Sequence, residues 1–182
     1  MDVEVAERKT GVNEMLESIA FGATDGCICF LGIIVGVARA TSDIRAVIIA
    51  AVVGGIADAM GNSVGFFVSQ TTERTVQLNA SNGEEHEHVH TEKEVYMSGV
   101  GTFLATVAVL GLLLLPFAFL TIWWGVAVAS LVSVVVAFSL GSYVGRLGTT
   151  HPFKVGIKYA AVTVFGAAVS YGVGELLSFW VH

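Results

Sequence analysis

The sequence predicts an all-α integral membrane protein with five transmembrane helices, its N-terminus in the cytoplasm and its C-terminus outside. The first observation is composition: the 182 residues are 54% hydrophobic, with a mean hydropathy of +0.76. The second is charge, because only 13% of the residues are charged, whereas a soluble domain carries about 25%. The third is that the apolar residues fall into five segments. Each segment is long enough, at about 1.5 Å per residue, to cross a hydrocarbon core of about 30 Å.

The five apolar segments divide the chain into four regions. Residues 1–16 are polar and acidic, without a cleavable signal pattern, and are expected to form a cytoplasmic N-terminal segment. Residues 17–69 are expected to hold transmembrane helices 1 and 2, residues 70–96 a cytoplasmic His/Glu-rich metal-binding loop, and residues 97–182 helices 3 to 5. The individual spans are expected at about 17–38, 46–69, 97–120, 122–147 and 155–180.

The basic residues predict the orientation, because cytoplasmic loops carry an excess of Lys and Arg. With the N-terminus inside, seven of the nine basic residues are cytoplasmic and two are outside. The seven are Arg8, Lys9, Arg74, Lys93, Arg146, Lys154 and Lys158, and the two are Arg39 and Arg45. The pattern therefore favours a cytoplasmic N-terminus.

Small residues predict close packing of the spans. Glycines recur four residues apart, as at Gly22 and Gly26, and this spacing lets helix backbones approach one another in lipid. Pro116, followed by Trp123 and Trp124, predicts a tight turn with interfacial anchors between the third and fourth spans.

Several classes of function are excluded by composition and motif. A net charge of −6 with no basic run argues against a nucleic-acid binder. Both cysteines lie in the first span, so no secreted-type disulfide framework is expected. No nucleophile–base pair or phosphate-binding loop is present, and we do not expect an enzyme.

The first span contains a carboxylate, Asp25, among residues that otherwise belong in hydrocarbon. An Asp at the centre of a membrane helix costs about 3 kcal/mol, so it is kept neutral, paired or held against a cation. Cys29 lies one helical turn further on the same face, and Glu14 lies on that face eleven residues back. Cys29 is either a soft metal ligand or a small buried hydrophobic residue.

The second span carries a matching polar stripe, in which Asp58 is followed after one turn by Asn62. Asn62 could simply hydrogen-bond across helices, and both carboxylates could cap a structural network. Carboxylate and amide oxygens, however, suit divalent cations, and a nearby sulfur shifts preference towards iron or zinc. We therefore expect Asp25 and Asp58 to face each other and to hold a metal ion with Asn62 and Cys29.

The loop between the second and third spans is rich in His and Glu. Imidazole and carboxylate groups suit first-row divalent ions, and we expect a labile, pH-dependent cation collector here; the alternative is a solvated acidic loop. The candidate ligands are Glu84, Glu85, His86, Glu87, His88 and His90. Glu14 and Glu17 are expected to gather cations at the same mouth. Glu175, in the fifth span, either lines an exit or reaches the interface.

The order of these features resembles the vacuolar iron transporter family over about residues 14–180. Thr24-Asp25-Gly26 is similar to that family's Asn-Asp-Gly helix, and the segment from Gly65 to Arg74 is similar to its Gly-Glu-Tyr-x-Ser-x-x-Ser-Gln-Arg-Glu segment. A charged insert, a Leu-Leu-Pro-Phe turn and a glycine-containing fifth helix follow in the family's order.

The resemblance implies a homodimer of five-helix protomers that exports Fe²⁺, and often Mn²⁺, from the cytosol in exchange for protons. The family's pathway Asp falls on Asp25, and its acidic residue at the start of the first helix falls on Glu14. The chain departs from the family where Asn62 replaces a Met and Phe66 replaces a Glu. Asp58 stands at a normally small position, and the short His/Glu loop replaces a long helical insert.

The sequence thus predicts a multi-pass divalent-metal transporter of a prokaryotic plasma membrane. Its cargo would be Fe²⁺ or Mn²⁺, with Zn²⁺ and Co²⁺ as further candidates, and no tightly bound cofactor is expected. Protons, membrane lipid and a second copy of the chain are the expected partners. The alternative is a membrane-embedded metal-binding or sensor protein without transport, for which the His/Glu loop matters and the two Asp residues do not.

Overall fold

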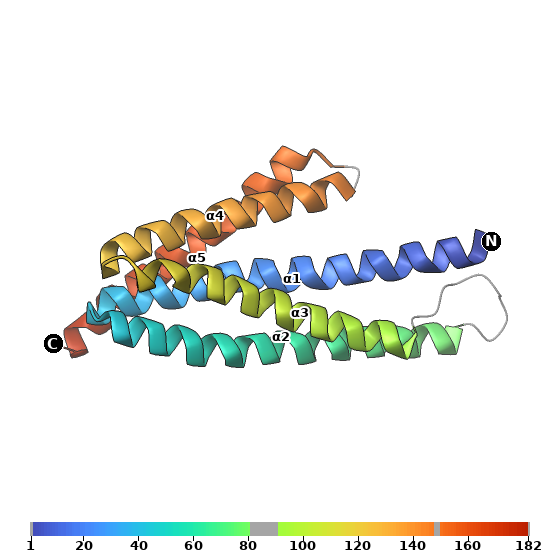
Figure 1. Cartoon of the computed structure of the whole chain (residues 1–182), viewed down its shortest axis with the longest axis horizontal. Coiled ribbons are helices and arrows are strands. Elements are labelled where there is room, and N and C mark those ends of the chain that lie inside the picture. Colours follow the sequence, from blue (N-terminus) through green and yellow to red (C-terminus); the bar gives the residue numbers. More distant parts are fainter. Residues whose placement is uncertain (1, 81–90, 148–149, 182) are drawn as a thin grey trace.

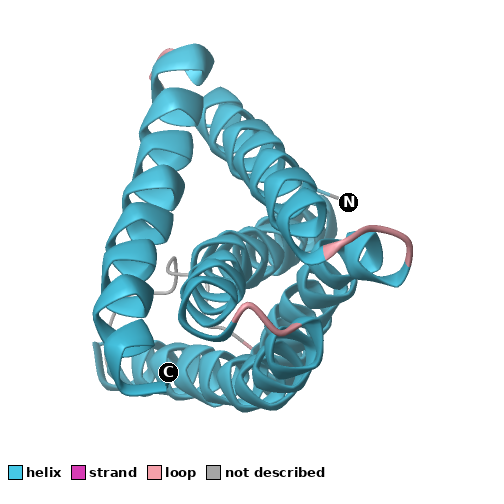
Figure 2. Cartoon of the chain, turned by 90° about the vertical axis from the view of Figure 1, so that its left-hand side faces the viewer, coloured by secondary structure: helices cyan, strands magenta, loops and turns pink. Residues whose placement is uncertain are grey.

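The computed structural model of the chain is helical over most of the residues that it describes. Figure 2 shows helices and loops, and no strand, among the described residues. The structure describes the backbone of residues 2–80, 91–147 and 150–181, and the side chains of residues 15–78, 91–146 and 150–180.

In the described part of the chain, five long helices and one short 3₁₀ helix follow one another (Figure 1). They are α1 (Asp2–Thr41), α2 (Ile44–Ala80), α3 (Glu92–Leu114), η1 (Leu115–Ala118), α4 (Ile122–Leu147) and α5 (Pro152–Val181). Each long helix contains a stretch that is long and apolar enough to cross a membrane, which confirms the five predicted spans. The two termini lie at opposite ends of the bundle. The predicted cytoplasmic location of the N-terminus stays a prediction.

The helices extend beyond the predicted spans at several ends. Helix α1 already begins at Asp2, and α2 continues to Ala80. The expectation of a loop over 70–96 is therefore corrected, because its first eleven residues and the residues from Glu92 onward are helical. Hydropathy reports the part of a helix that lies in lipid, whereas the helix itself continues into polar sequence. The predicted turn between the third and fourth spans is the 3₁₀ helix η1, with Pro116 in its first turn.

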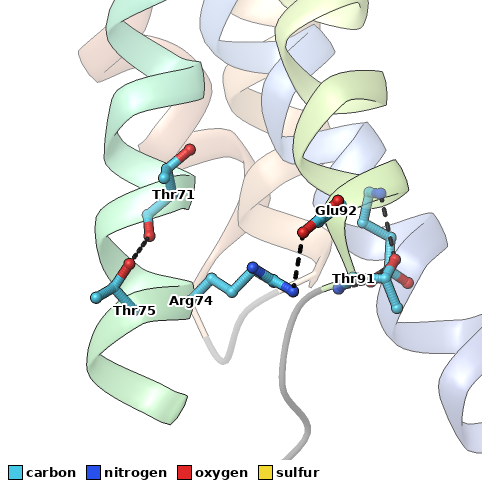
Figure 3. A network of polar contacts seen from close by, with 6 residues as sticks. Thr71, Arg74, Thr75, Thr91 and Glu92 are labelled. Atoms are coloured by element: carbon cyan, nitrogen blue, oxygen red, sulfur yellow. Dashed lines mark hydrogen bonds and ion pairs between the residues drawn. The ribbon is translucent and has the colours of Figure 1, made fainter. Parts of the chain in front are cut away.

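Polar contacts define where α3 begins and join it to α2 (Figure 3). Thr91 is the N-cap of α3: its Oγ1 accepts a hydrogen bond from the backbone N–H of Glu94, and the Glu94 carboxylate accepts one from the backbone N–H of Thr91 at 2.7 Å. This reciprocal pair satisfies two helix donors that have no partner within the helix. Arg74 of α2 lies 3.5 Å from Glu92 of α3 in an ion pair.

Helix α1 is the centre of the bundle, because it packs against each of the other four long helices. Phe30, Leu31 and Ile34 of α1 are almost fully buried and lie in the middle of the core. Figure 1 shows α4 and α5 diverging from α1 towards the N-terminal end of α1. Helix α1 is thus in contact with other helices on several sides.

Hydroxyl groups on the neighbouring helices bind backbone carbonyls of α1. Thr106 Oγ1 donates to the carbonyl of Gly22 at 3.1 Å, and Thr102 makes the same kind of contact one turn earlier. Ser133 of α4 donates to the carbonyl of Cys27 at 2.8 Å. Such bonds require close approach, and a Cβ added at Gly22 would lie 2.8 Å from Thr106 Oγ1 and still closer to the carbonyl oxygen of Thr102. Gly22 therefore fixes the separation of α1 and α3.

We predict that Gly22→Ala destabilises the bundle by about 1–3 kcal/mol, the usual cost of overpacking a close contact. Gly111→Ala is the matched control, because nothing lies within 4 Å of a Cβ added at Gly111. The control should be neutral or slightly stabilising, since Ala is the better helix former. Thermal unfolding of the two purified variants in the same detergent measures the difference. Equal unfolding midpoints would show that α1 and α3 can move apart to accept the added methyl group without loss of stability.

Candidate metal site

Three polar side chains from α1 and α2 meet inside the spanning region. The Asn62 amide nitrogen donates one hydrogen bond to Asp25 Oδ2, at 2.7 Å, and a second to Asp58 Oδ2, at 3.2 Å. Asp25 comes from α1, whereas Asp58 and Asn62 lie one turn apart on α2. The expectation that the two carboxylates approach each other across the first two helices is confirmed as geometry.

Cys29 extends this contact along α1. Its thiol, one turn after Asp25, lies beside the Asp58 carboxylate. The four side chains of Asp25, Asn62, Asp58 and Cys29 therefore form one continuous set, called the polar quartet below. All four are partly buried. The helical spacing of four residues within each helix places both pairs on facing sides of α1 and α2.

The amide of Asn62 provides the positive end of a dipole to two negative groups. Two carboxylates with no donor between them would repel each other strongly in a low-dielectric setting. Among the described side chains, no three His, Cys, Asp or Glu groups lie close enough together to hold a metal ion. Asn62 also carries an amide oxygen, an acceptor that makes neither of these two bonds.

A cavity of about 660 Å³ lies beside Asp25. Glu17 lines it two turns before Asp25 on the same face of α1, so the cavity carries two carboxylates. Tyr143 of α4 and Tyr159 of α5 form part of the opposite wall. Six water molecules occupy about 180 Å³ of liquid volume, so a hydrated divalent ion fits in this space.

Two of these wall residues were not among the residues singled out from sequence. Tyr143 and Tyr159 are lone aromatic residues in apolar helices, which a sequence pattern does not distinguish from interfacial anchors. Thr24 also lines the cavity, and its Oγ1 is buried without a hydrogen-bond partner in the structure as described. The position of Thr24 next to Asp25 is evident from the sequence. The lack of a hydrogen-bond partner for its hydroxyl group is seen only in the structure.

Other predicted ligands lie elsewhere or outside the described side chains. Glu14 is in α1, and its side chain is not among those described. The loop residues Glu84, Glu85, His86, Glu87, His88 and His90 all lie outside the described residues. Glu175, for which two roles were open, forms an ion pair with Arg39, whose guanidinium lies 5.7 Å from the centre of the Tyr171 ring. This ion pair joins α1 to α5 near the C-terminal end of α1.

The shared amide should couple the two helices energetically. In a double-mutant cycle, Asp25→Ala and Asn62→Ala should differ from additivity by at least about 0.5 kcal/mol, because each removes the same hydrogen bond. Thr72→Ala replaces Asn62→Ala in the control cycle: it is ten residues, or about 15 Å, further along α2 and bonds only its own helix. The free energies of unfolding are measured by SDS titration in mixed micelles. If the changes in unfolding free energy are additive within error in both cycles, the hydrogen bond between Asn62 and Asp25 does not couple the two helices.

Comparison with known proteins agrees with the predicted resemblance. A model of the VIT family matches residues 16–97, which include the spanning parts of α1 and α2. The chain is 27% identical to vacuolar iron transporter homolog 1 of Oryza sativa subsp. japonica over 181 residues, which cover 90% of this chain and 74% of that protein. It is 27% identical to VIT-like transporter 1b of Glycine max over 180 residues, with 90% and 76% covered. An uncharacterized protein of Methanocaldococcus jannaschii is 26% identical over 153 residues, with 79% and 80% covered. The chain is therefore similar to the VIT family over its first two spans, and at low identity to these relatives over most of its length.

Proposed function

We propose that this protein exports a divalent metal ion, Fe²⁺ or Mn²⁺, from the cytosol in exchange for protons. The family and the names of two relatives support metal transport in general, and transport rather than catalysis. The observation that carries the more specific proposal is the Asn62 amide held between Asp25 and Asp58 within the membrane. Ionisable residues at this depth are functional by default, because they are costly to keep there.

The cargo ion would be bound by the two carboxylates and the amide oxygen of Asn62. In the structure, the amide nitrogen lies between the carboxylates. A half-turn of the amide replaces this donor with the oxygen, which is an acceptor, so the same residue serves the empty and the loaded site. Three oxygen ligands suit Mn²⁺ and Fe²⁺. The Cys29 thiol, which lies beside Asp58, offers a softer ligand that would favour Fe²⁺, Zn²⁺ or Co²⁺.

Exchange with protons follows from competition for the same two carboxylates. A metal ion binds the deprotonated groups, so its binding releases protons and its departure allows them to return. Two carboxylates can hold either two protons or one divalent ion, and the two loaded forms then carry the same charge. A charge-balanced cycle of this kind avoids moving an uncompensated carboxylate pair through the bilayer, which is expensive.

The remaining parts of the proposal concern the surroundings of the site. With the N-terminus in the cytoplasm, Glu17 would guide cations through the cavity towards Asp25. Glu14 and the His/Glu loop would collect cations at the cytoplasmic surface and release them as the pH falls, because a ligating imidazole must be neutral. Two copies of the chain in a prokaryotic plasma membrane complete the proposal.

The central test is metal entry into proteoliposomes that contain the purified protein. Asp25→Asn should reduce Fe²⁺ or Mn²⁺ entry, and the opposite movement of protons, to the level of empty vesicles. Asp43→Asn is the matched control: it removes the same charge from the exposed turn between α1 and α2, and an Asn still caps the start of α2. Metal flux is followed with a trapped indicator, and pH is recorded on both sides. Full transport by Asp25→Asn would overturn the proposal.

A second variant separates transport from sensing. Replacing His86, His88 and His90 with Ala should raise the metal concentration needed for half-maximal flux and leave the maximal flux intact, because the loop only collects cations. If wild-type protein of known orientation binds metal through these histidines but moves none, the protein is a metal sensor. Metal binding is measured by equilibrium dialysis on the same preparations that are assayed for flux.

A further inference from the structure

Ile28 lies at the centre of the membrane-spanning part of α1. The spanning stretch runs from Met15 to Thr41, so thirteen residues precede Ile28 and thirteen follow it. At 1.5 Å per residue, the residue is about 20 Å from either end of the stretch. Transporters commonly place their substrate sites at this depth.

Two cavities meet at Ile28. The first, of about 660 Å³, extends along α1 from Leu16 to Ile28. The second, of about 550 Å³, lies between α1 and α5 and extends along α1 from Ile28 to Thr41. Among the residues whose side chains are described, Ile28 is the one that lines both cavities. The two cavities therefore point towards opposite ends of the spanning stretch and are separated at the level of a single apolar side chain.

The Ile28 side chain rests on the backbone of α5. A Cβ added at Gly166 would lie 3.2 Å from Ile28 Cγ2, so no side chain separates the isoleucine from the α5 helix at this point. The glycine lets α5 approach, and the branched isoleucine fills the space. An apolar constriction of this kind blocks water and ions, because a hydrated ion would have to lose its shell there.

The polar quartet passes this constriction on the neighbouring face of α1. Asp25 lines the first cavity and Cys29 lines the second. Asn62 of α2 bonds both Asp25 and Asp58, and Cys29 lies beside Asp58, so a series of polar groups leads past Ile28. Each member offers an oxygen or a sulfur within one side-chain length of the next.

We propose that Ile28 is the barrier between two oppositely facing aqueous cavities, and that ions cross it only along the polar quartet, from Asp25 to Cys29. The first half concerns water access alone. The second half rests on the proposed function, because it assigns the order in which the cargo ion meets its ligands. Ile28 is thus a positioning residue that forces the ion onto the carboxylates and prevents a leak.

The barrier is tested by cysteine labelling, which requires neither metal nor transport. Ala20→Cys reports on the first cavity and Ser170→Cys on the second, both in a Cys29→Ser background that retains the fully buried Cys27. A membrane-impermeant cationic methanethiosulfonate is added to one side or the other of oriented proteoliposomes. Ala20→Cys should react only from the side of the α1 N-terminus, and Ser170→Cys only from the opposite side.

Ile28→Ala should remove this sidedness and raise the labelling rate from the wrong side at least tenfold for each reporter. Ile33→Ala is the matched control: it also lines the second cavity, but it packs against Gly54 of α2 and does not line the first cavity. It should keep the sidedness. If Ile28→Ala does not fold, as judged by size-exclusion chromatography, Ile28→Val should give a smaller change in the same direction.

Three results would overturn the barrier. The reporters could react from both sides with Ile28 present, they could react from neither side, or their sidedness could survive in both Ile28 variants. Failure of metal transport with intact sidedness would instead count against the proposed function alone. The route along the quartet is tested by Cys29→Ser, which should slow the release of Fe²⁺ to the far side. Unchanged release would remove Cys29 from the route.

Discussion

The arrangement of α1 and α2 depends on the hydrogen bonds that offset the free-energy cost of keeping two carboxylates within the membrane. An unpaired Asp at this depth costs several kcal/mol, and two of them beside each other would cost more. The amide of Asn62 reduces this cost by donating to both, at 2.7 and 3.2 Å. Because one side chain must reach Asp25 on α1 and Asp58 on α2, the relative depth of the two helices is fixed. The same contact brings Cys29 to Asp58 and so determines the course of the whole polar quartet.

The rest of the bundle holds α1 where this contact requires it. Hydroxyl groups of α3 and α4 bind carbonyls of α1 at Gly22 and Cys27, one on each side of Asp25 along the helix. These bonds use groups of the neighbouring helices and leave the side chain of Asp25 free to face α2 and the first cavity. Close packing with α3 therefore anchors α1 without using its polar face. The divergence of α4 and α5 from α1 then leaves room for the cavity (Figure 1).

The number of spans could be predicted from sequence, because each span is recognised from the hydropathy of one helix. The pairing of the polar stripes could also be predicted, because two helices each carry such a stripe. Asp25, Asp58 and Asn62 were expected together for that reason. The lengths of α1 and α2 were underestimated, because hydropathy identifies only the part of a helix that lies in lipid. Both helices continue beyond that part into polar sequence. Tyr143, Tyr159 and Ile28 gain their roles only from where α4 and α5 cross α1. Such crossings are tertiary facts that no local pattern of apolar residues specifies.

The position of sulfur in the quartet bears on ion selectivity. The resembled family has a Met where this chain has Asn62, so the thioether ligand has been replaced by an amide oxygen. A sulfur is still present, but it belongs to Cys29 on α1, which lies next to Asp58 and lines the second cavity, whereas Asp25 lines the first. A cation entering at Asp25 would therefore meet hard oxygen ligands first and the softer thiol second. Since softer ions gain more from a thiolate than harder ones do, discrimination between Fe²⁺ and Mn²⁺ would arise at the second step rather than at entry.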